Sequence, residues 1–220
     1  MNVSAPTWTI LVPTLGQREA LFARLMGVLL PQLDEHEGRV RVLAWRNNGQ
    51  PSISQIRDAL VAAAGSDYVS FIDDDDLVPE YYVAEIVRAI AERPDHVGFK
   101  IEYSTDDEHR EIVEHSLKWR KWGRGHDGQL YRDVTHIDPV RTDLAVRGRF
   151  RVRPGRAEDR VWVKQVRKFL RTEVYIDKIM YYYLYREHIT AWRSPQTIEH
   201  VAGRPAIDHP YFSWHPESDA

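Results

Sequence analysis

Residues 68–76 read YVSFIDDDD, a short apolar-rich run followed at once by the four aspartates Asp73–Asp76. The run, Tyr68–Ile72, is typical of a buried strand. Four adjacent carboxylates repel one another unless a cation lies nearby. At the carboxyl end of a parallel strand they would lie where open α/β sheets bind ligands, and such oxygen ligands suit Mg²⁺ or Mn²⁺ bridging a diphosphate. The alternative is a solvated acidic turn or a helix N-cap, a role that suits Asp76 best.

Strand and helix patterns alternate on both sides of this stretch. The apolar runs Trp8–Val12 and Val40–Ala44 are each followed by apolar residues at helical spacing, over Leu21–Leu29 and Ile53–Ala63. After the aspartates, Pro79 is expected to open a helix that continues to residue 90. Three strand–helix units in succession predict an α/β fold with a mostly parallel central sheet covered by helices.

The pattern becomes less regular after residue 94. Val97–Tyr103 and Ile112–His115 are expected to pair as a hairpin, and an irregular stretch follows over Lys118–Asp138. A helix is predicted over Asp159–Leu170 and a strand over Glu173–Ile176. The aromatic run at residues 180–185 suits either a strand or a packing ridge.

Composition excludes several classes of protein. The chain has 220 residues, 43% hydrophobic and 29% charged, as expected for one globular domain. Its net charge of −3 excludes a generally basic nucleic-acid coat. The absence of Cys excludes disulfide frameworks, thiol catalysis and thiolate-bound metals. No apolar run is long enough to cross a bilayer and no basic leader precedes the first strand, so we expect a soluble, cytoplasmic protein.

The order of these motifs resembles the family 2 glycosyltransferases of the GT-A fold, which move a sugar from a nucleotide diphosphate donor to an acceptor. Thr9–Thr14 is similar to the opening strand of the family, which implies that Pro13 and Thr14 line the nucleoside and that Arg18 binds the donor. Asn47 stands where the family usually has an Asp that contacts the base. An amide keeps hydrogen-bonding capacity without the charge, so the resemblance implies a uracil-bearing donor.

The acidic stretch resembles the Asp-x-Asp motif of the family. The resemblance implies that Asp75 is the principal ligand of Mn²⁺ or Mg²⁺, and that Asp73 or Asp74 contacts the ion, the ribose or a water. Arg57 matches an Arg that faces the donor in the family, whereas Asp58 departs from the usual Asn beside it.

Residues 157–162 resemble the Glu-Asp motif of the family, which implies that Asp159 is the catalytic base of an inverting reaction and that Glu158 lies at the acceptor site. From the residues alone, an acid in the first turn of a helix is the alternative for Asp159. His188 lies near where many members place a late metal-binding histidine, with a surface histidine as the alternative. His136 belongs to a His-x-x-Pro stretch that would shape the acceptor site or begin a helix.

The resemblance thus implies an inverting, metal-dependent glycosyltransferase that uses a nucleotide diphosphate sugar, most simply a UDP-sugar. We expect one GT-A domain over residues 1–220. Its nucleotide-sugar-binding half would be 1–95 and its acceptor and catalytic half 96–190, with an extended tail over 191–220 lying on the body or on a partner such as a second copy in a homodimer.

A basic segment points to one kind of acceptor. Residues 141–171 hold eleven Lys and Arg against three acids, although the whole chain is acidic. The segment brackets Asp159, so an anionic acceptor such as modified DNA, a teichoic-type polymer or lipid phosphate is one interpretation, and a solvated helix face is the other. Trp122, with Trp119, Trp192 and Trp214, would stack on sugars or bases or serve as core and interface.

Other functions fit the same residues. A catalytically silent module that binds nucleotide sugars or nucleic acid would keep the fold and the basic segment. A phosphotransferase or nucleotidyltransferase would use the same acid cluster and metal but would cleave between phosphates. The acceptor itself, whether glycan, protein, lipid phosphate or modified DNA, is left open by the sequence.

Overall fold

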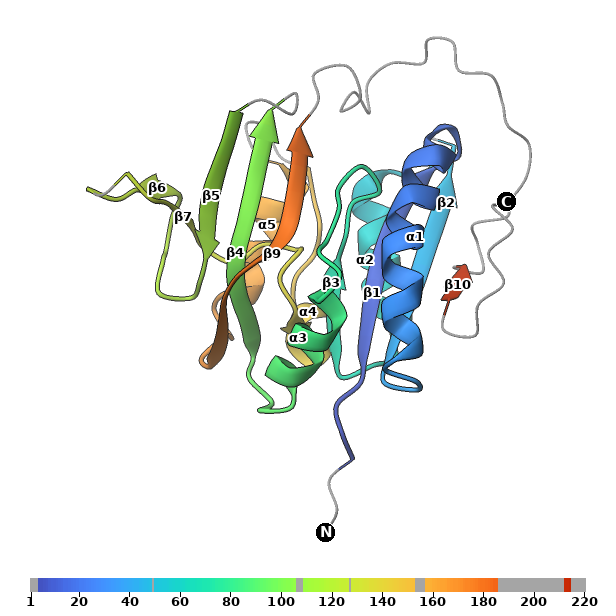
Figure 1. Cartoon of the computed structure of the whole chain (residues 1–220), viewed down its shortest axis with the longest axis horizontal. Helices are drawn as coiled ribbons and strands as arrows, with labels where there is room; N and C mark the ends of the chain where they lie inside the picture. Colours follow the sequence, from blue (N-terminus) through green and yellow to red (C-terminus); the bar gives the residue numbers. More distant parts are fainter. Residues whose placement is uncertain are drawn as a thin grey trace.

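One ten-stranded sheet runs through the protein, in the order β10-β2-β1-β3-β8-β4-β5-β7-β6, and β9 pairs with β4 (Figure 1). The computed structural model describes residues 4–48, 50–105, 109–126, 128–152 and 157–185, together with the backbone of 212–214. In these residues no helix is both long enough and apolar enough to cross a membrane.

The first half of the chain forms the parallel part of the sheet. Strand β1 pairs in parallel with β2 and with β3, and helices follow each of the three strands. The elements are β1 (Trp8–Leu15), the 3₁₀ turn η1 (Gly16–Arg18), α1 (Glu19–Asp34), β2 (Val40–Asn47), α2 (Ile53–Ala63), β3 (Tyr68–Phe71) and α3 (Tyr82–Ile90).

The second half extends the same sheet with mixed pairing. Strand β4 is antiparallel to β5 and parallel to β9, and the short β8 lies between β3 and β4 and is antiparallel to both. The elements are β4 (His96–Thr105), β5 (His109–His115), β6 (Gly123–Arg124), β7 (Leu130–Arg132), β8 (Val140–Arg141), α4 (Thr142–Ala145), α5 (Glu158–Val166), β9 (Glu173–Tyr185) and β10 (Phe212–Trp214).

Two apolar clusters cover the two faces of the sheet. Alternate residues of β1 point to opposite faces, so Ile10 packs with α1 and α3 while Leu11 packs with α2, α4 and α5. On the second face Trp162 of α5 stacks on Phe150, with 5.1 Å between ring centroids, and donates a hydrogen bond to the carbonyl of Ala145. This packing fixes the start of α5, where Glu158 and Asp159 lie, against the end of β3.

The three expected strand–helix units and the hairpin are present, with corrected bounds. The helix expected from Pro79 begins at Tyr82, because the Pro79 carbonyl accepts a turn hydrogen bond from Tyr82 N–H and the Gln32 side chain accepts from Val83 N–H. The helix expected over residues 159–170 is α5 and ends at Val166.

The helix does not continue to residue 170 because Asp95, the residue before β4, binds the segment that follows α5. Oδ2 of Asp95 accepts hydrogen bonds from the N–H groups of Arg171 and Thr172, at 2.8 and 3.1 Å. The two segments at 173–176 and 180–185 form one strand, β9, whose register against β4 shifts between Phe99 and Ile101. Most of the tail at 191–220 lies outside the described residues, and β10 pairs in parallel with β2.

Candidate active site

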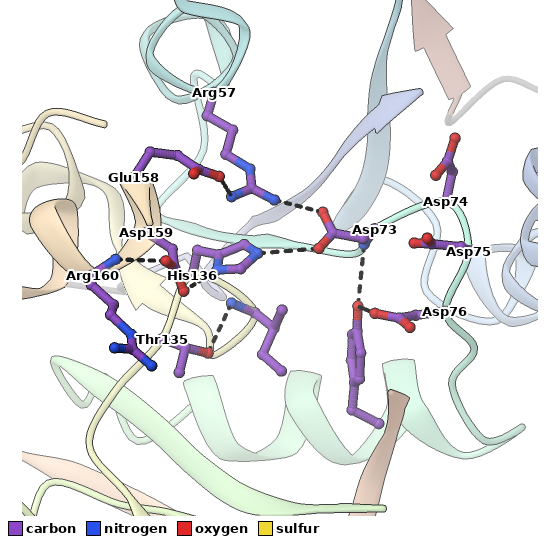
Figure 2. A network of polar contacts seen from close by, with 12 residues as sticks. Arg57, Asp73, Asp74, Asp75, Asp76, Thr135, His136, Glu158, Asp159 and Arg160 are labelled. Carbon is purple, nitrogen blue, oxygen red and sulfur yellow. Dashed lines mark hydrogen bonds and ion pairs between the residues drawn. The ribbon is translucent and has the colours of Figure 1, made fainter. Parts of the chain in front are cut away.

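The four aspartates lie at the carboxyl end of β3 and have different partners (Figure 2). Oδ1 of Asp73 accepts a hydrogen bond from Nη2 of Arg57 at 2.8 Å, and Oδ2 lies 3.4 Å from Nε2 of His136. Burial alone would raise the pKa of Asp73, but the charge of Arg57 and the contacts with His136 outweigh it and hold the pKa well below its usual range. Asp73 is therefore a carboxylate that is ionised and already paired.

Arg57 joins the acidic loop to α5. Its Nη1 lies 2.7 Å from Oε1 of Glu158, so one buried guanidinium binds Asp73 and Glu158 together. The guanidinium also lies over the rings of Phe71 and Phe150, at 5.6 and 5.8 Å from their centroids. Arg57 was expected at the donor site. The structure shows that it also positions Glu158.

Asp74 and Asp75 share a different cation, Arg18. Nη1 of Arg18 lies 2.8 Å from Oδ1 of Asp74 and 3.1 Å from Oδ2 of Asp75. The hydroxyl of Thr14 donates a further hydrogen bond to Asp74 at 2.7 Å. Burial, and next the negative charge of Asp73, raises the pKa of Asp75 to about 6. Asp75 thus carries negative charge that its neighbours do not fully compensate.

Asp76 has different partners from this pair and is held by β9. The hydroxyl of Tyr181 donates a hydrogen bond to its Oδ2 at 2.7 Å, and the N–H of Leu184 donates to its Oδ1 at 2.8 Å. Tyr181 is fully buried, and its hydroxyl also accepts a hydrogen bond from the N–H of Asp73. These bonds anchor the acidic loop on β9 and give Asp76 a structural part. Asp76 is buried and the N-cap residue of α3 is Tyr81, so neither the solvated turn nor the helix N-cap describes it.

Asp159 lies across His136 from the aspartates. Its Oδ2 is 3.8 Å from Nδ1 of His136 and 3.4 Å from Nη2 of Arg132, and its Oδ1 accepts the N–H of Arg160 at 2.7 Å. Burial would raise the pKa of Asp159, but the charges of His136, Arg132 and Arg57 lower it below the usual value. The carboxylate is ionised at neutral pH, which is the form that a general base needs.

A cavity of about 250 Å³ lies between the carboxyl ends of β1 and β3 and the end of β9. Its wall includes all four aspartates of the loop and most of the residues expected to bind the donor. The expected residues that line it are Pro13, Thr14, Arg18, Arg57, Asp73, Asp74, Asp75 and Glu158. We call this space the donor cavity.

Asp75 suits a cation that arrives with a diphosphate. In the part of the chain that is described, no group of three or more His, Asp or Glu side chains is arranged to hold a metal ion. Mg²⁺, however, is commonly held by one or two carboxylates together with substrate phosphates. Asp75 borders the donor cavity, and its negative charge is not fully compensated. The residues present therefore fit a metal ion whose remaining ligands are phosphate oxygens. They do not form a complete set of ligands for a metal alone.

Four of the expected site residues that the structure describes do not line the donor cavity: Asn47, Trp122, His136 and Asp159. Asn47 is buried at the end of β2, and its amide donates a hydrogen bond to the Pro51 carbonyl at 3.0 Å. Trp122 is 54% exposed and lies, like Asp159, on a second cavity. His188 lies outside the described residues, so its assignment stays a prediction.

Sequence reasoning missed several residues that shape the site. Tyr183 and Tyr185 line the donor cavity from β9, and Arg132 lies beside Asp159. The alternating tyrosines at 181, 183 and 185 were a signal for Tyr183 and Tyr185, because alternate residues of a strand share a face. No local pattern marks Arg132, whose contact with Asp159 spans 27 residues.

A family model described as Glycosyl transferase family 2 matches residues 29–142, which is more than half of the chain. The chain therefore belongs to glycosyl transferase family 2. The match covers β2, β3 and the acidic loop, and it ends before α5. A comparison with curated proteins gives no match.

Solved structures of S. aureus TarS share the fold. TarS 1–349 in complex with UDP is 16% identical with a TM-score of 0.62, over 81% of this chain and 60% of that chain. The complex with UDP-GlcNAc is 16% identical with a TM-score of 0.57, over 82% of this chain and 59% of that chain. A longer TarS chain is matched over 36% of its length, with 15% identity and a TM-score of 0.61. The protein thus has the glycosyltransferase fold and spans less than two thirds of these TarS chains.

Proposed function

We propose that the protein transfers a sugar from a UDP-sugar to an acceptor hydroxyl, with inversion at the anomeric carbon and with a divalent cation. The observation that carries the proposal is the position of His136 between Asp73 of the donor cavity and Asp159 of α5, at 3.4 and 3.8 Å. This arrangement sets a candidate base beside a cavity whose residues suit a nucleotide diphosphate.

A uridine donor is favoured by the shared fold. Two of the TarS structures are complexes, one with UDP and one with UDP-GlcNAc, and this chain shares their fold. The donor cavity offers Arg18 for the diphosphate and the loop of Pro13 and Thr14 for the nucleoside. A divalent cation held by Asp75 would neutralise charge on the departing diphosphate.

The residues of α5 supply the acceptor side of the reaction. The Asp159 carboxylate takes the proton of the acceptor hydroxyl as its oxygen attacks the anomeric carbon and the bond from that carbon to the diphosphate oxygen breaks. A single displacement of this kind inverts the configuration. Arg57 keeps Glu158, and with it the first turn of α5, at a fixed place relative to Asp73. A cytoplasmic location and a homodimer stay predictions.

Product analysis tests the proposal. The full chain is incubated with UDP-GlcNAc or UDP-glucose and Mn²⁺, and the nucleotides are separated by anion exchange. Sugar transfer, or slow transfer to water, releases UDP, and we expect Asp159→Asn to slow that release by about 10³-fold. The matched control is Asp143→Asn, which makes the same change at a carboxylate paired with Arg141.

Two outcomes would contradict the proposal. UMP and a sugar phosphate as products would indicate cleavage between phosphates, as in a phosphotransferase or nucleotidyltransferase. Equal UDP release by wild type and Asp159→Asn would remove Asp159 from the chemistry, and no turnover together with intact UDP binding would favour a catalytically silent binding module.

A further inference from the structure

A second cavity, of about 780 Å³, opens beside Asp159 and is lined mainly by cations. Of its thirteen lining residues, eight are Lys or Arg and two are acids. They come from the segment after β5, from β7, and from α5 with the turn that follows it. We call this space the basic cavity. It gathers only part of the basic segment 141–171 and adds cations that are distant in sequence.

Most of these cations have no acidic partner. Arg132 pairs with Asp159, and Arg167 pairs with Asp133 at 2.9 Å. Within the described part of the chain, the other six form no ion pair: Arg120, Lys121, Arg160, Lys164, Lys168 and Arg171. Like charges gathered around one concave surface raise its potential and concentrate anions there. Since the whole chain has a net charge of −3, this potential is a local feature.

The cations follow α5 away from Asp159. Arg160 and Lys164 lie one turn apart on α5, and Arg167, Lys168 and Arg171 follow in the turn after it, and all five line the basic cavity. A line of charges of this kind matches a ligand whose negative charges repeat along a chain, because a single anion would contact one or two of them. The line begins next to Asp159, so a chain bound along it would bring one of its groups to that carboxylate.

An aromatic ring marks the same end of the cavity. The guanidinium of Arg132 lies 3.8 Å from the ring centroid of Trp122, and that of Arg160 lies 5.2 Å from it. Burial lowers the pKa of Arg132 to about 10, yet it stays protonated at neutral pH. Stacking holds two guanidinium groups beside Asp159, and guanidinium groups bind phosphate oxygens with two parallel hydrogen bonds.

We propose that the basic cavity binds an acceptor built on a phosphodiester chain, with its phosphates along α5 and the turn that follows it, and with the hydroxyl to be glycosylated at Asp159. This inference rests on the proposed function, because that function makes Asp159 the base on the acceptor side. The proposal defines the acceptor by its repeating phosphodiester charge. The groups that link the phosphates are not specified.

Binding of defined phosphodiesters to the full chain tests the inference without any turnover. Fluorescence anisotropy is measured with a labelled oligothymidylate of about twelve nucleotides, with an abasic oligomer of equal phosphate number, and with an oligoglutamate peptide of equal charge. We expect the two phosphodiesters to bind with similar affinity, the peptide to bind about tenfold more weakly, and the affinity of both phosphodiesters to fall steeply with salt.

The double variant Lys164→Glu/Lys168→Glu should weaken phosphodiester binding by at least about tenfold. The matched control is Arg149→Glu/Arg151→Glu, which makes the same change in net charge at exposed residues of the same basic segment that do not line the cavity. All four side chains are exposed, so both variants are expected to fold. The control should bind the phosphodiesters within about twofold of wild type.

Other results overturn the inference. Equal losses of phosphodiester affinity in the two double variants would indicate long-range electrostatic attraction without a specific site. Tight binding of the oligothymidylate alone would indicate recognition of bases. Binding of the peptide as tight as that of the phosphodiesters would indicate a carboxylate-rich acceptor. UDP binding with Mn²⁺, measured in parallel on the same variants, separates the two proposals. Intact UDP binding without phosphodiester binding defeats only the acceptor inference, and the reverse result defeats the proposed function.

Discussion

Nη1 of Arg57 lies 2.7 Å from Oε1 of Glu158, in an ion pair that joins α2 to α5 across 101 residues of sequence. The other arm of the same guanidinium binds Asp73 at 2.8 Å. One buried side chain therefore sets the distance between the loop that lines the donor cavity and the helix that carries the candidate base. The relative placement of the two halves of the site therefore depends on Arg57 as well as on the packing of Trp162 against Phe150.

The first prediction concerns Arg57. A Lys at this position keeps a positive charge but has no planar fork, so it cannot bind both carboxylates in the same geometry. We expect Arg57→Lys to stay folded and to lose about 10²-fold in kcat. Arg57→Met leaves two carboxylates without their cation and should lower the free energy of unfolding by about 3–5 kcal/mol. Urea denaturation and steady-state kinetics check the two variants. An unchanged kcat in Arg57→Lys would contradict the claim that Arg57 positions Glu158 and Asp73.

The second prediction concerns the packing beneath α5. A Cβ at Gly148 would lie 2.6 Å from Cδ1 of Trp162 and 2.6 Å from Cγ2 of Val166, so α5 must shift to admit it. We expect Gly148→Ala to cost about 1–3 kcal/mol of stability and to reduce activity, since α5 carries Asp159. Gly27→Ala is the matched control, because that exposed position in α1 has nothing within 4 Å, and it should stabilise the protein by about 0.5–1 kcal/mol. Equal effects of both substitutions on activity would contradict the link to α5.

The third prediction concerns acid stability. Asp138 is fully buried, and its Oδ1 lies 2.9 Å from Nδ1 of His115 while its Oδ2 lies 3.4 Å from Nε2 of His96. Burial would raise the pKa of Asp138, but the two imidazoles hold it well below its usual value of 3.8. Because the folded state keeps this carboxylate ionised to lower pH than the unfolded chain does, its stabilising contribution is present above about pH 4 and is lost as the pH falls through the lower folded-state pKa.

Asp138→Asn should therefore be less stable than wild type at pH 7 and should lose less stability as the pH falls below about 4. Urea denaturation at several pH values checks this. A second effect is expected on activity, since Oδ2 of Asp138 accepts the N–H of Thr135 at 2.7 Å, next to His136. Parallel stability curves for wild type and Asp138→Asn over the acid range would show that Asp138 does not titrate as described.

The fourth prediction concerns the anchor of the acidic loop. Tyr181→Phe removes the hydroxyl that donates to Asp76 and accepts from the N–H of Asp73. The N–H of Asp73 and Oδ2 of Asp76 lose this partner, while Oδ1 of Asp76 keeps the bond from Leu184 N–H, and the loss should cost about 1–3 kcal/mol of stability. Tyr182→Phe, one residue along β9, serves as the control and should change stability by less than about 0.5 kcal/mol. Similar losses in both variants would show that the Tyr181 hydroxyl does not anchor the loop.

The local part of the fold and site could be predicted from the sequence. Apolar runs such as Trp8–Val12 and the helical spacing after them describe the parallel half, because each pattern lies within one element. The acidic stretch falls at the end of β3 as expected, since it follows the strand directly. Apart from Asn47, the residues expected at the donor site converge because the carboxyl ends of β1 and β3 lie on the same edge of the sheet.

The rest depends on contacts between distant segments. Nothing local divides the four aspartates into one bound to Arg57, two to Arg18 and one to Tyr181. The register shift against β4 interrupts the pattern of β9, so one strand reads as two runs. The basic cavity could not be predicted as a unit either, because its cations come from three segments that meet only in the folded chain.

Metal-dependent binding of UDP tests the central claim most directly. The melting temperature of the full chain is measured with UDP, with Mn²⁺ and with both, in wild type, in Asp75→Asn and in the exposed control Asp177→Asn. UDP with Mn²⁺ should raise the melting temperature of wild type and of the control by several degrees, as about 2–3 kcal/mol of ligand stabilisation implies for a chain of this size, and Asp75→Asn should lose that increment. The same UDP shift with and without Mn²⁺, or no shift for wild type, would contradict the account.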